Sequence, residues 1–295
     1  MQETVGILTA LLSTLAWAIG TIKLKDIGEN ASPLSMTLVK SLYCAILLTV
    51  IAFCTHTALI IDKQYLLVLI TSGIIGITLG DCLFFASLRR LSPVVLSVIL
   101  LSGPDIVTGI LSFIILKEIP STVTFIGIIT TLFGLSKIIF PVKEDCSKSK
   151  ISGYIFAFLS LICTAISTVI IKPVLPYVPT LTATIYRLLF GGIALLLFTS
   201  FEGNTKKCLI PFKDKSFRKS FFKIMSLIAI GGFWLSIVAF KNINLITAST
   251  LMTLEPLFIL LIMMIFFNYK PLPKEVIGIT ITIVGILLIS YGEIW

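Results

Sequence analysis

Ionisable residues recur at matched positions in two apolar stretches of the chain. Lys40 and Arg187 are 147 residues apart, and each lies in an apolar run long enough to cross a bilayer. Pro104 and Pro256 repeat the relationship at a spacing of 152. A charged side chain in hydrocarbon costs at least ~2.5 kcal/mol, so it normally faces a protein interior or an aqueous cavity. The matched positions therefore predict a solute-binding cavity between two copies of one membrane unit.

Charged residues inside the predicted spans define a candidate binding site. The set contains two bases and three acids: Lys40, Asp81, Asp105, Arg187 and Glu255. Lys40 and Asp81 could form a buried ion pair that only joins helices, or they could contact a solute. The bases would suit a carboxylate or phosphate on the solute, and the acids would suit an amine.

Prolines stand beside two of these acids. Asp105 follows Pro104, and Glu255 precedes Pro256. Proline lacks a backbone N–H and interrupts a helix, which frees carbonyl groups toward a polar cavity. We therefore expect helix breaks at both prolines, with both acids in the binding site. Glu255 could also take up and release a proton during transport, which would couple solute flux to a proton gradient.

Two tryptophans lie at unusual depths. Trp17 and Trp234 are within predicted spans, whereas tryptophan is most common at the membrane interface. Each could line the cavity or simply pack between helices. We expect both to line the substrate path.

The composition identifies an integral membrane protein. Of 295 residues, 57% are hydrophobic and only 13% are charged, and the mean hydropathy is +1.10. Long unbroken apolar runs predict helices, because barrel strands would alternate polar and apolar residues. Ten such runs are present: 4–22, 34–54, 64–88, 94–116, 123–140, 151–171, 181–201, 222–240, 246–267 and 272–290. The expected fold is all-α with ten transmembrane helices.

A polar linker at 141–150 divides the chain into two units, 1–140 and 151–295, with five predicted spans each. Because five is odd, the second unit must insert upside down relative to the first, which predicts inverted repeats. The register supports this, since Leu12-Ser13 matches Leu159-Ser160 at an offset of 147, the same offset as the basic pair.

Basic residues are distributed unequally between the two sets of loops. The loops after the odd-numbered spans hold sixteen Lys or Arg residues, against four in the other loops: Lys63, Lys117, Lys172 and Lys241. The positive-inside rule assigns the basic-rich face to the cytoplasm. Both termini would then lie outside the cytoplasm.

These features together resemble the ten-helix drug/metabolite transporter superfamily, in particular proteins with two EamA domains, over nearly the whole chain. The matching positions are Lys40, Arg187, Phe84-Phe85-Ala86-Ser87-Leu88 and Leu254-Glu255-Pro256. The departures are Gly103-Pro104-Asp105 in place of a Glu-Pro pair, and Leu116-Lys117-Glu118 and Asn268-Tyr269-Lys270 in place of Leu-Gly-Glu. Members are commonly drawn with both termini in the cytoplasm, opposite to the orientation that the charges indicate.

The resemblance implies a multi-pass secondary transporter of the cytoplasmic (inner) membrane that works by alternating access. Given the charged set, we expect a small polar or zwitterionic substrate, such as an amino acid or derivative, with efflux as the direction. Two alternatives stay open: an importer or exchanger of a nucleotide-like or cationic metabolite, and a lipid-linked carrier or flippase. The expected partners are the small-molecule substrate, membrane lipid and protons as coupling ion, and the protein would be a monomer or homodimer.

Other classes of function lack support in the sequence. An ATP-driven pump would need a G-x-x-x-x-G-K-[ST] phosphate loop, which the chain does not contain. Six cysteines without paired spacing and one histidine, His56, indicate neither a disulfide framework nor a metal site. Asp81 and Asp105 could formally be a catalytic pair, yet neither lies in a catalytic motif, so no enzyme activity and no cofactor are expected. The basic stretch 206–223 is explained by topology, and no nucleic acid partner is expected.

Overall fold

The computed structural model describes residues 2–28, 31–91, 103–139, 148–266 and 269–294, and every regular element within them is helical. Eight described helices are long and apolar enough to cross a membrane: Gln2–Leu24, Pro33–Cys54, Lys63–Leu88, Ile151–Val174, Thr180–Phe201, Lys215–Asn242, Leu245–Phe266 and Pro273–Gly292. Two shorter apolar helices, Val107–Leu116 and Thr122–Gly134, lie in the predicted fourth and fifth spans. Both of those spans extend into residues outside the described part. The all-helical membrane fold is confirmed, while the count of ten stays a prediction.

The spans are divided into shorter elements. The first half contains α1 (Gln2–Gly28), α2 (Pro33–Cys54), α3 (Lys63–Ser72), η1 (Gly73–Gly80), α4 (Asp81–Leu88), α6 (Gly103–Leu111), η3 (Ser112–Leu116) and α7 (Thr122–Ile139). The second half begins with α8 (Lys148–Ile171), η4 (Lys172–Val174), α9 (Thr180–Phe201), α10 (Thr205–Leu209), η5 (Ile210–Lys213) and α11 (Lys215–Leu227). It ends with η6 (Ile228–Trp234), α12 (Leu235–Asn242), α13 (Leu245–Met252), α14 (Glu255–Phe266) and α15 (Pro273–Ile294).

Local sequence explains where several helices begin. Ser32 caps α2, because its hydroxyl accepts a 3.1 Å hydrogen bond from the Ser35 N–H. Pro33 follows at the first turn, where a helix does not need the missing N–H. Asp214 caps α11 in the same way, accepting bonds from the N–H groups of Ser216 at 3.0 Å and Phe217 at 3.4 Å.

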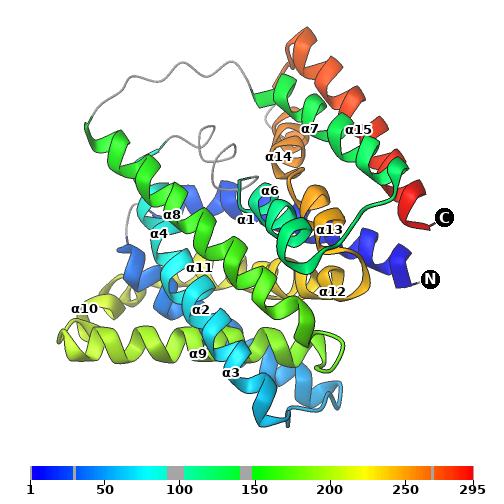
Figure 1. The fold of residues 1–295 in the computed structure, drawn as a ribbon. Helices are drawn as coiled ribbons and strands as arrows, with labels where there is room; N and C mark the ends of the chain where they lie inside the picture. Colours follow the sequence, from blue (N-terminus) through cyan, green and yellow to red (C-terminus); the bar gives the residue numbers. More distant parts are fainter. Residues whose placement is uncertain (1, 29–30, 92–102, 140–147, 267–268, 295) are drawn as a thin grey trace.

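Helices of the two halves pack against each other in matched combinations. Figure 1 shows α7 beside α15 at one end of the molecule and α2 with α9 at the other, and both pairs are in contact. α1 packs on η6 and α12, and α8 packs on η1 and α4. Exchanging the two halves reproduces this pattern, as expected for two copies of one helical unit.

Glycines allow α7 and α15 to approach closely. A Cβ atom added to Gly127 on α7 would lie 2.7 Å from the Ile289 nitrogen and 2.9 Å from the Gly285 carbonyl oxygen on α15. Helices in lipid gain no hydrophobic energy by meeting, so close backbone packing through small residues contributes most of their association. The pair therefore depends on the absence of side chains at these positions.

Two π-helical segments occupy matched places in the third and eighth predicted spans. They are η1, which contains three glycines, and η6, which contains two. A π turn removes some backbone carbonyls from the regular helical hydrogen-bond pattern. Serines of the other half satisfy one carbonyl in each segment: Ser160 donates a 2.8 Å bond to Gly80 O, and Ser13 donates a 2.9 Å bond to Gly232 O. These are the two serines that match at an offset of 147.

The ninth predicted span is interrupted immediately before Pro256. α13 ends at Met252 and α14 begins at Glu255, and Pro256 lies in the first turn of α14. The break brings Glu255 to the beginning of a helix. In the first half, Pro104 lies in the first turn of α6, but the side chains of Pro104 and Asp105 are outside the described part of the structure.

Candidate functional site

A cavity of about 150 Å³ lies between the two halves of the chain. Its polar lining consists of Thr14, Lys40, Asp81, Ser160, Thr164, Thr168, Arg187, Ser236 and Glu255. Its aromatic lining consists of Trp17, Phe84, Phe85, Phe233 and Phe240. α1, α2, η1 and α4 contribute from the first half, and α8, α9, η6, α12, α13 and α14 from the second. The matched basic residues thus reach one common space.

Lys40 and Asp81 form an ion pair at the wall of this cavity. The Lys40 side chain is almost fully buried, and its ammonium group also lies 5.0 Å from the centre of the Phe233 ring and 5.4 Å from that of Phe85. Such contacts between a cation and a ring face are attractive. The pair both joins α2 to α4 and lines the cavity, so the two interpretations of these residues are geometrically compatible.

Arg187 lies on α9 and also faces the cavity. Its Nη2 donates a 2.9 Å hydrogen bond to Ser167 Oγ, while its buried Nε has no hydrogen-bond partner. Among the residues that the structure describes, Arg187 takes part in no ion pair. A Cβ atom at Gly76 would collide with the Ser167 hydroxyl. The glycine therefore makes room for this hydroxyl beside the Arg187 guanidinium.

A serine cluster holds the group that Arg187 contacts. Ser167 Oγ donates a 2.8 Å bond to Ser72 O, and Ser72 Oγ donates a 2.8 Å bond to Ser167 O. The two hydroxyls are themselves 2.8 Å apart. This reciprocal arrangement joins α3 to α8 and fixes the position of the Ser167 oxygen next to the guanidinium.

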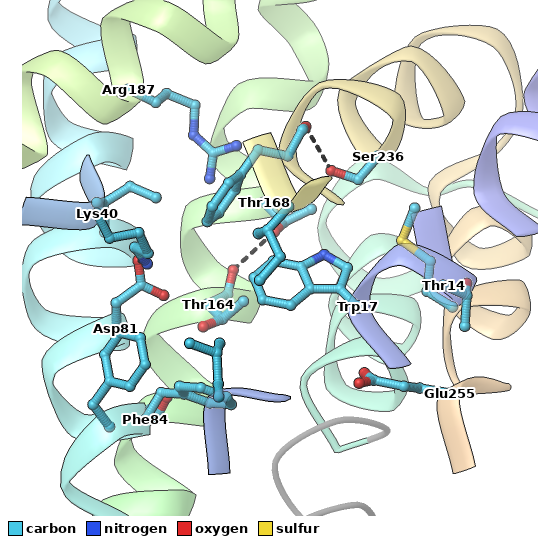
Figure 2. Close-up of a pocket in the computed structure, with 18 of the residues that line it drawn as sticks. Thr14, Trp17, Lys40, Asp81, Phe84, Thr164, Thr168, Arg187, Ser236 and Glu255 are labelled. Carbon is cyan, nitrogen blue, oxygen red and sulfur yellow. Dashed lines mark hydrogen bonds and ion pairs between the residues drawn. The ribbon is translucent and has the colours of Figure 1, made fainter. Parts of the chain in front are cut away.

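Glu255 lines another part of the cavity, at the beginning of α14. Only 4% of its surface is exposed, and its Oε1 accepts a 3.0 Å hydrogen bond from the Thr21 hydroxyl on α1. Figure 2 shows the Trp17 indole between Glu255 on one side and Arg187 with the Lys40–Asp81 pair on the other. In this view the Trp17 ring separates the Glu255 carboxylate from Arg187 and the Lys40–Asp81 pair.

The two tryptophans differ in position. Trp17 lines the cavity and contacts the Phe233 ring edge to face, with ring centres 5.1 Å apart. Trp234 is not among the described lining residues, and its indole N–H instead donates a 3.3 Å bond to Thr180 Oγ1 on α9. Phe233, one position earlier in η6, occupies the cavity-facing place. A substrate role for Trp234 stays a prediction, while in this structure the neighbouring Phe233 lines the cavity.

Several contributors were not among the residues that the sequence singled out for the site. Ser167 contacts Arg187 and Thr21 contacts Glu255 directly, while Ser72 holds Ser167 in place. Hydroxyl groups are frequent in these spans, and most bond the preceding turn of their own helix, as Thr168 does with Thr164 O at 2.9 Å. Spacing alone therefore could not separate the positioning hydroxyls from the rest. The prediction for Asp105 is not tested, because its side chain is outside the description.

Comparison with known proteins gives one consistent result. The family model described as the EamA-like transporter family matches residues 4–140 and again residues 151–291. A protein of Archaeoglobus fulgidus described as an uncharacterized transporter is 26% identical over 283 residues, which cover 96% of this chain and 97% of that protein. A solved crystal structure of another protein, 14% identical, superposes with a TM-score of 0.73 and covers 97% of this chain and 94% of that one. The structural likeness shows a shared fold.

Proposed function

The chain belongs to the EamA-like transporter family, and from this premise we propose that it is a secondary transporter of a small zwitterionic metabolite, such as an amino acid or derivative. It would export this solute across the cytoplasmic membrane. Two inverted five-helix repeats would expose the cavity alternately to each side, with substrate bound between them. The cavity lined by both halves and the reciprocal packing of their helices support this mechanism.

The separation of charge in the cavity is the observation that carries the proposal. Lys40 is neutralised by Asp81, whereas Arg187 forms no ion pair among the described residues. The guanidinium is therefore the cation that a substrate carboxylate would neutralise, and arginine commonly binds a carboxylate through paired N–H···O bonds. Glu255, across the Trp17 ring, would accept the substrate ammonium.

The dimensions and walls of the cavity narrow the substrate further. A space of about 150 Å³ resembles cavities that hold a benzene-sized molecule, and it favours a small metabolite over a nucleotide or a lipid-linked solute. Trp17, Phe84 and Phe233 offer ring faces and edges for the carbon part of such a solute. A zwitterion with a short apolar side chain meets all these requirements.

Glu255 would also provide the coupling to protons. Substrate ammonium and proton would compete for one carboxylate, so that binding of one releases the other. The Thr21 hydroxyl, which donates to Oε1, would orient the carboxylate in both states. Glu255→Gln keeps the shape and hydrogen-bonding capacity of the side chain but removes the charge. We expect this variant to lose proton-coupled flux.

Counterflow into liposomes tests the proposal. Purified protein would be reconstituted with each unlabelled compound of a metabolite library inside, and uptake of the labelled compound would be followed. We expect saturable counterflow for a zwitterion, lost in Arg187→Gln and Glu255→Gln. The matched controls are Arg218→Gln and Glu202→Gln, because both side chains are exposed and neither is among the described lining residues.

The outcomes separate the alternatives. Counterflow of cationic or nucleotide-like compounds that does not depend on Arg187 would contradict the zwitterion assignment. Absence of flux for every water-soluble compound, together with transfer of a lipid-linked solute, would replace it with a flippase. Flux whose rate and pH dependence survive Glu255→Gln would remove the coupling role of that residue.

A further inference from the structure

Glu118 forms a compact polar cluster away from the cavity. It lies between η3 and α7, and its Oε2 accepts bonds from the Ser112 hydroxyl at 2.5 Å and from the backbone N–H groups of Leu245 at 2.6 Å and Ile246 at 3.4 Å. The carboxylate thus caps the first turn of α13, where free N–H groups and the helix dipole favour an anion. A loop of the first half is bound in this way to a helix of the second half.

Lys172 extends this cluster to two more segments. It begins η4, and its Nζ donates 2.6 Å bonds to the carbonyl oxygens of Phe240 and Ile243, at the end of α12. The same Nζ lies 3.6 Å from Glu118 Oε1. One ion pair therefore joins the end of the sixth predicted span, the end of the eighth, the beginning of the ninth and the loop after the fourth.

The segments joined by this ion pair also lead to the binding site. Phe240 lines the cavity, and α13 leads into the break that positions Glu255. If the cavity opened toward this face, these helix ends would have to separate. The Glu118–Lys172 contacts would have to break first, because they cross from the first half to the second.

The repeat predicts where a matching latch would lie at the opposite face. An offset of 147 relates Lys172 to Lys25, and an offset of 152 relates Glu118 to Lys270. The place of the acid is therefore taken by a base, whose side chain is exposed. The nearby Glu275 caps its own helix instead, because its Oε2 accepts a 2.7 Å bond from the Leu272 N–H.

We propose that Glu118 and Lys172 form a latch that holds the cavity closed on one face, and that the missing acid at position 270 biases the resting transporter toward this conformation. The proposal rests on the alternating-access mechanism proposed above. In the opposite conformation, two cations would stand where the first face has an ion pair. The two conformations would therefore be unequally populated, although the two halves of the fold are related.

Distances between spin labels can test the latch without any substrate. One pair of labels, at Ile119 and Tyr177, would report on the Glu118 face, because both side chains are exposed and each follows one partner of the ion pair closely in the chain. The labels would be attached to cysteines introduced at these two positions. The native cysteines would be replaced by serine, and the resulting protein would have to remain monodisperse and insert into liposomes. Double electron–electron resonance would then give the distance distribution.

We expect one dominant short distance in the parent protein. Glu118→Gln should raise the ratio of long to short distances roughly tenfold, because the variant loses the carboxylate charge that strengthens these hydrogen bonds. Lys172→Gln should do the same, and it serves as a second variant if the first does not fold. Glu202→Gln is the control, because this exposed carboxylate is outside the cluster.

Lys270→Glu provides the converse test. This change supplies the acid that the second face lacks, so it should also raise the long-distance population at the Glu118 face while Glu118 and Lys172 stay intact. Distributions that do not move in Glu118→Gln, Lys172→Gln or Lys270→Glu would overturn the latch and leave the cluster as a static contact. If the label distances shift in these variants but no zwitterion shows counterflow, the substrate proposal is wrong and the latch is supported.

Discussion

The hydroxyl of Ser160 on α8 donates a 2.8 Å hydrogen bond to the carbonyl of Gly80, the last residue of the π-helical segment η1. Its counterpart Ser13 makes the same bond, at 2.9 Å, to Gly232 in η6. Each half thus stabilises the irregular segment of the other. π turns are frequent at functional sites, and here both segments lie in spans that line the cavity.

Removing one of these serines should loosen a π segment. In Ser160→Ala the Gly80 carbonyl loses its cross-half partner, and a buried unsatisfied carbonyl costs about 1–3 kcal/mol. We expect a lower melting temperature in detergent and a changed rate of counterflow. Ser87→Ala is the comparison, because the buried Ser87 hydroxyl bonds to Phe84 O within α4, outside the π segments, and does not line the described cavity. Equal effects of the two changes would contradict a special role for the cross-half bond.

The serine cluster should control the affinity of Arg187 for a substrate carboxylate. Ser167→Ala removes the oxygen that orients Nη2, and we expect KM to rise about tenfold with little change in kcat, because the charge remains. Counterflow kinetics over a range of substrate concentrations give both constants. Ser200→Ala, at an exposed position, should change neither. A fall in kcat alone would show that Ser167 acts at a step other than binding.

The Lys40–Asp81 pair makes a prediction about stability. Lys40→Met leaves the Asp81 carboxylate without its cation in a buried place, which should cost about 3–5 kcal/mol of the free energy of unfolding. The double change Lys40→Met with Asp81→Leu should recover most of this loss, since no buried charge remains. Unfolding in detergent with increasing denaturant measures both. If the double variant is stable but inactive in counterflow, the pair also contributes to transport.

Close packing of α7 on α15 predicts sensitivity to a single methyl group. Gly127→Ala places a Cβ within 3 Å of the α15 backbone, and overpacking of this kind costs about 1–3 kcal/mol. The melting temperature should fall. Ile126→Ala, whose side chain is half exposed on the same helix, should leave it nearly unchanged. An unchanged melting temperature in Gly127→Ala would mean that the two helices separate easily.

Much of the site could be predicted from particular residues. The offset that relates Lys40 to Arg187 and Ser13 to Ser160 identified positions that line one cavity or bond to the other half, because equivalent residues of related units occupy equivalent places. Pro256 located the helix break. The choice between Trp234 and Phe233 could not be made, because a π segment changes the rotational register by a fraction of a turn and no sequence period records this.

The sequence by itself determined that the chain is a helical membrane protein, that it contains two related units and that two of its intramembrane charges, Lys40 and Arg187, lie at matched positions. Hydropathy and repeat offsets carry that information, since the cost of burying charge in lipid acts on each span separately. Only the tertiary structure decided that Asp81 neutralises Lys40, that Arg187 faces the cavity beside Ser167, and that Glu118 reaches Lys172 and α13. These contacts join spans far apart in the chain, and their partners depend on how the helices cross and rotate against each other.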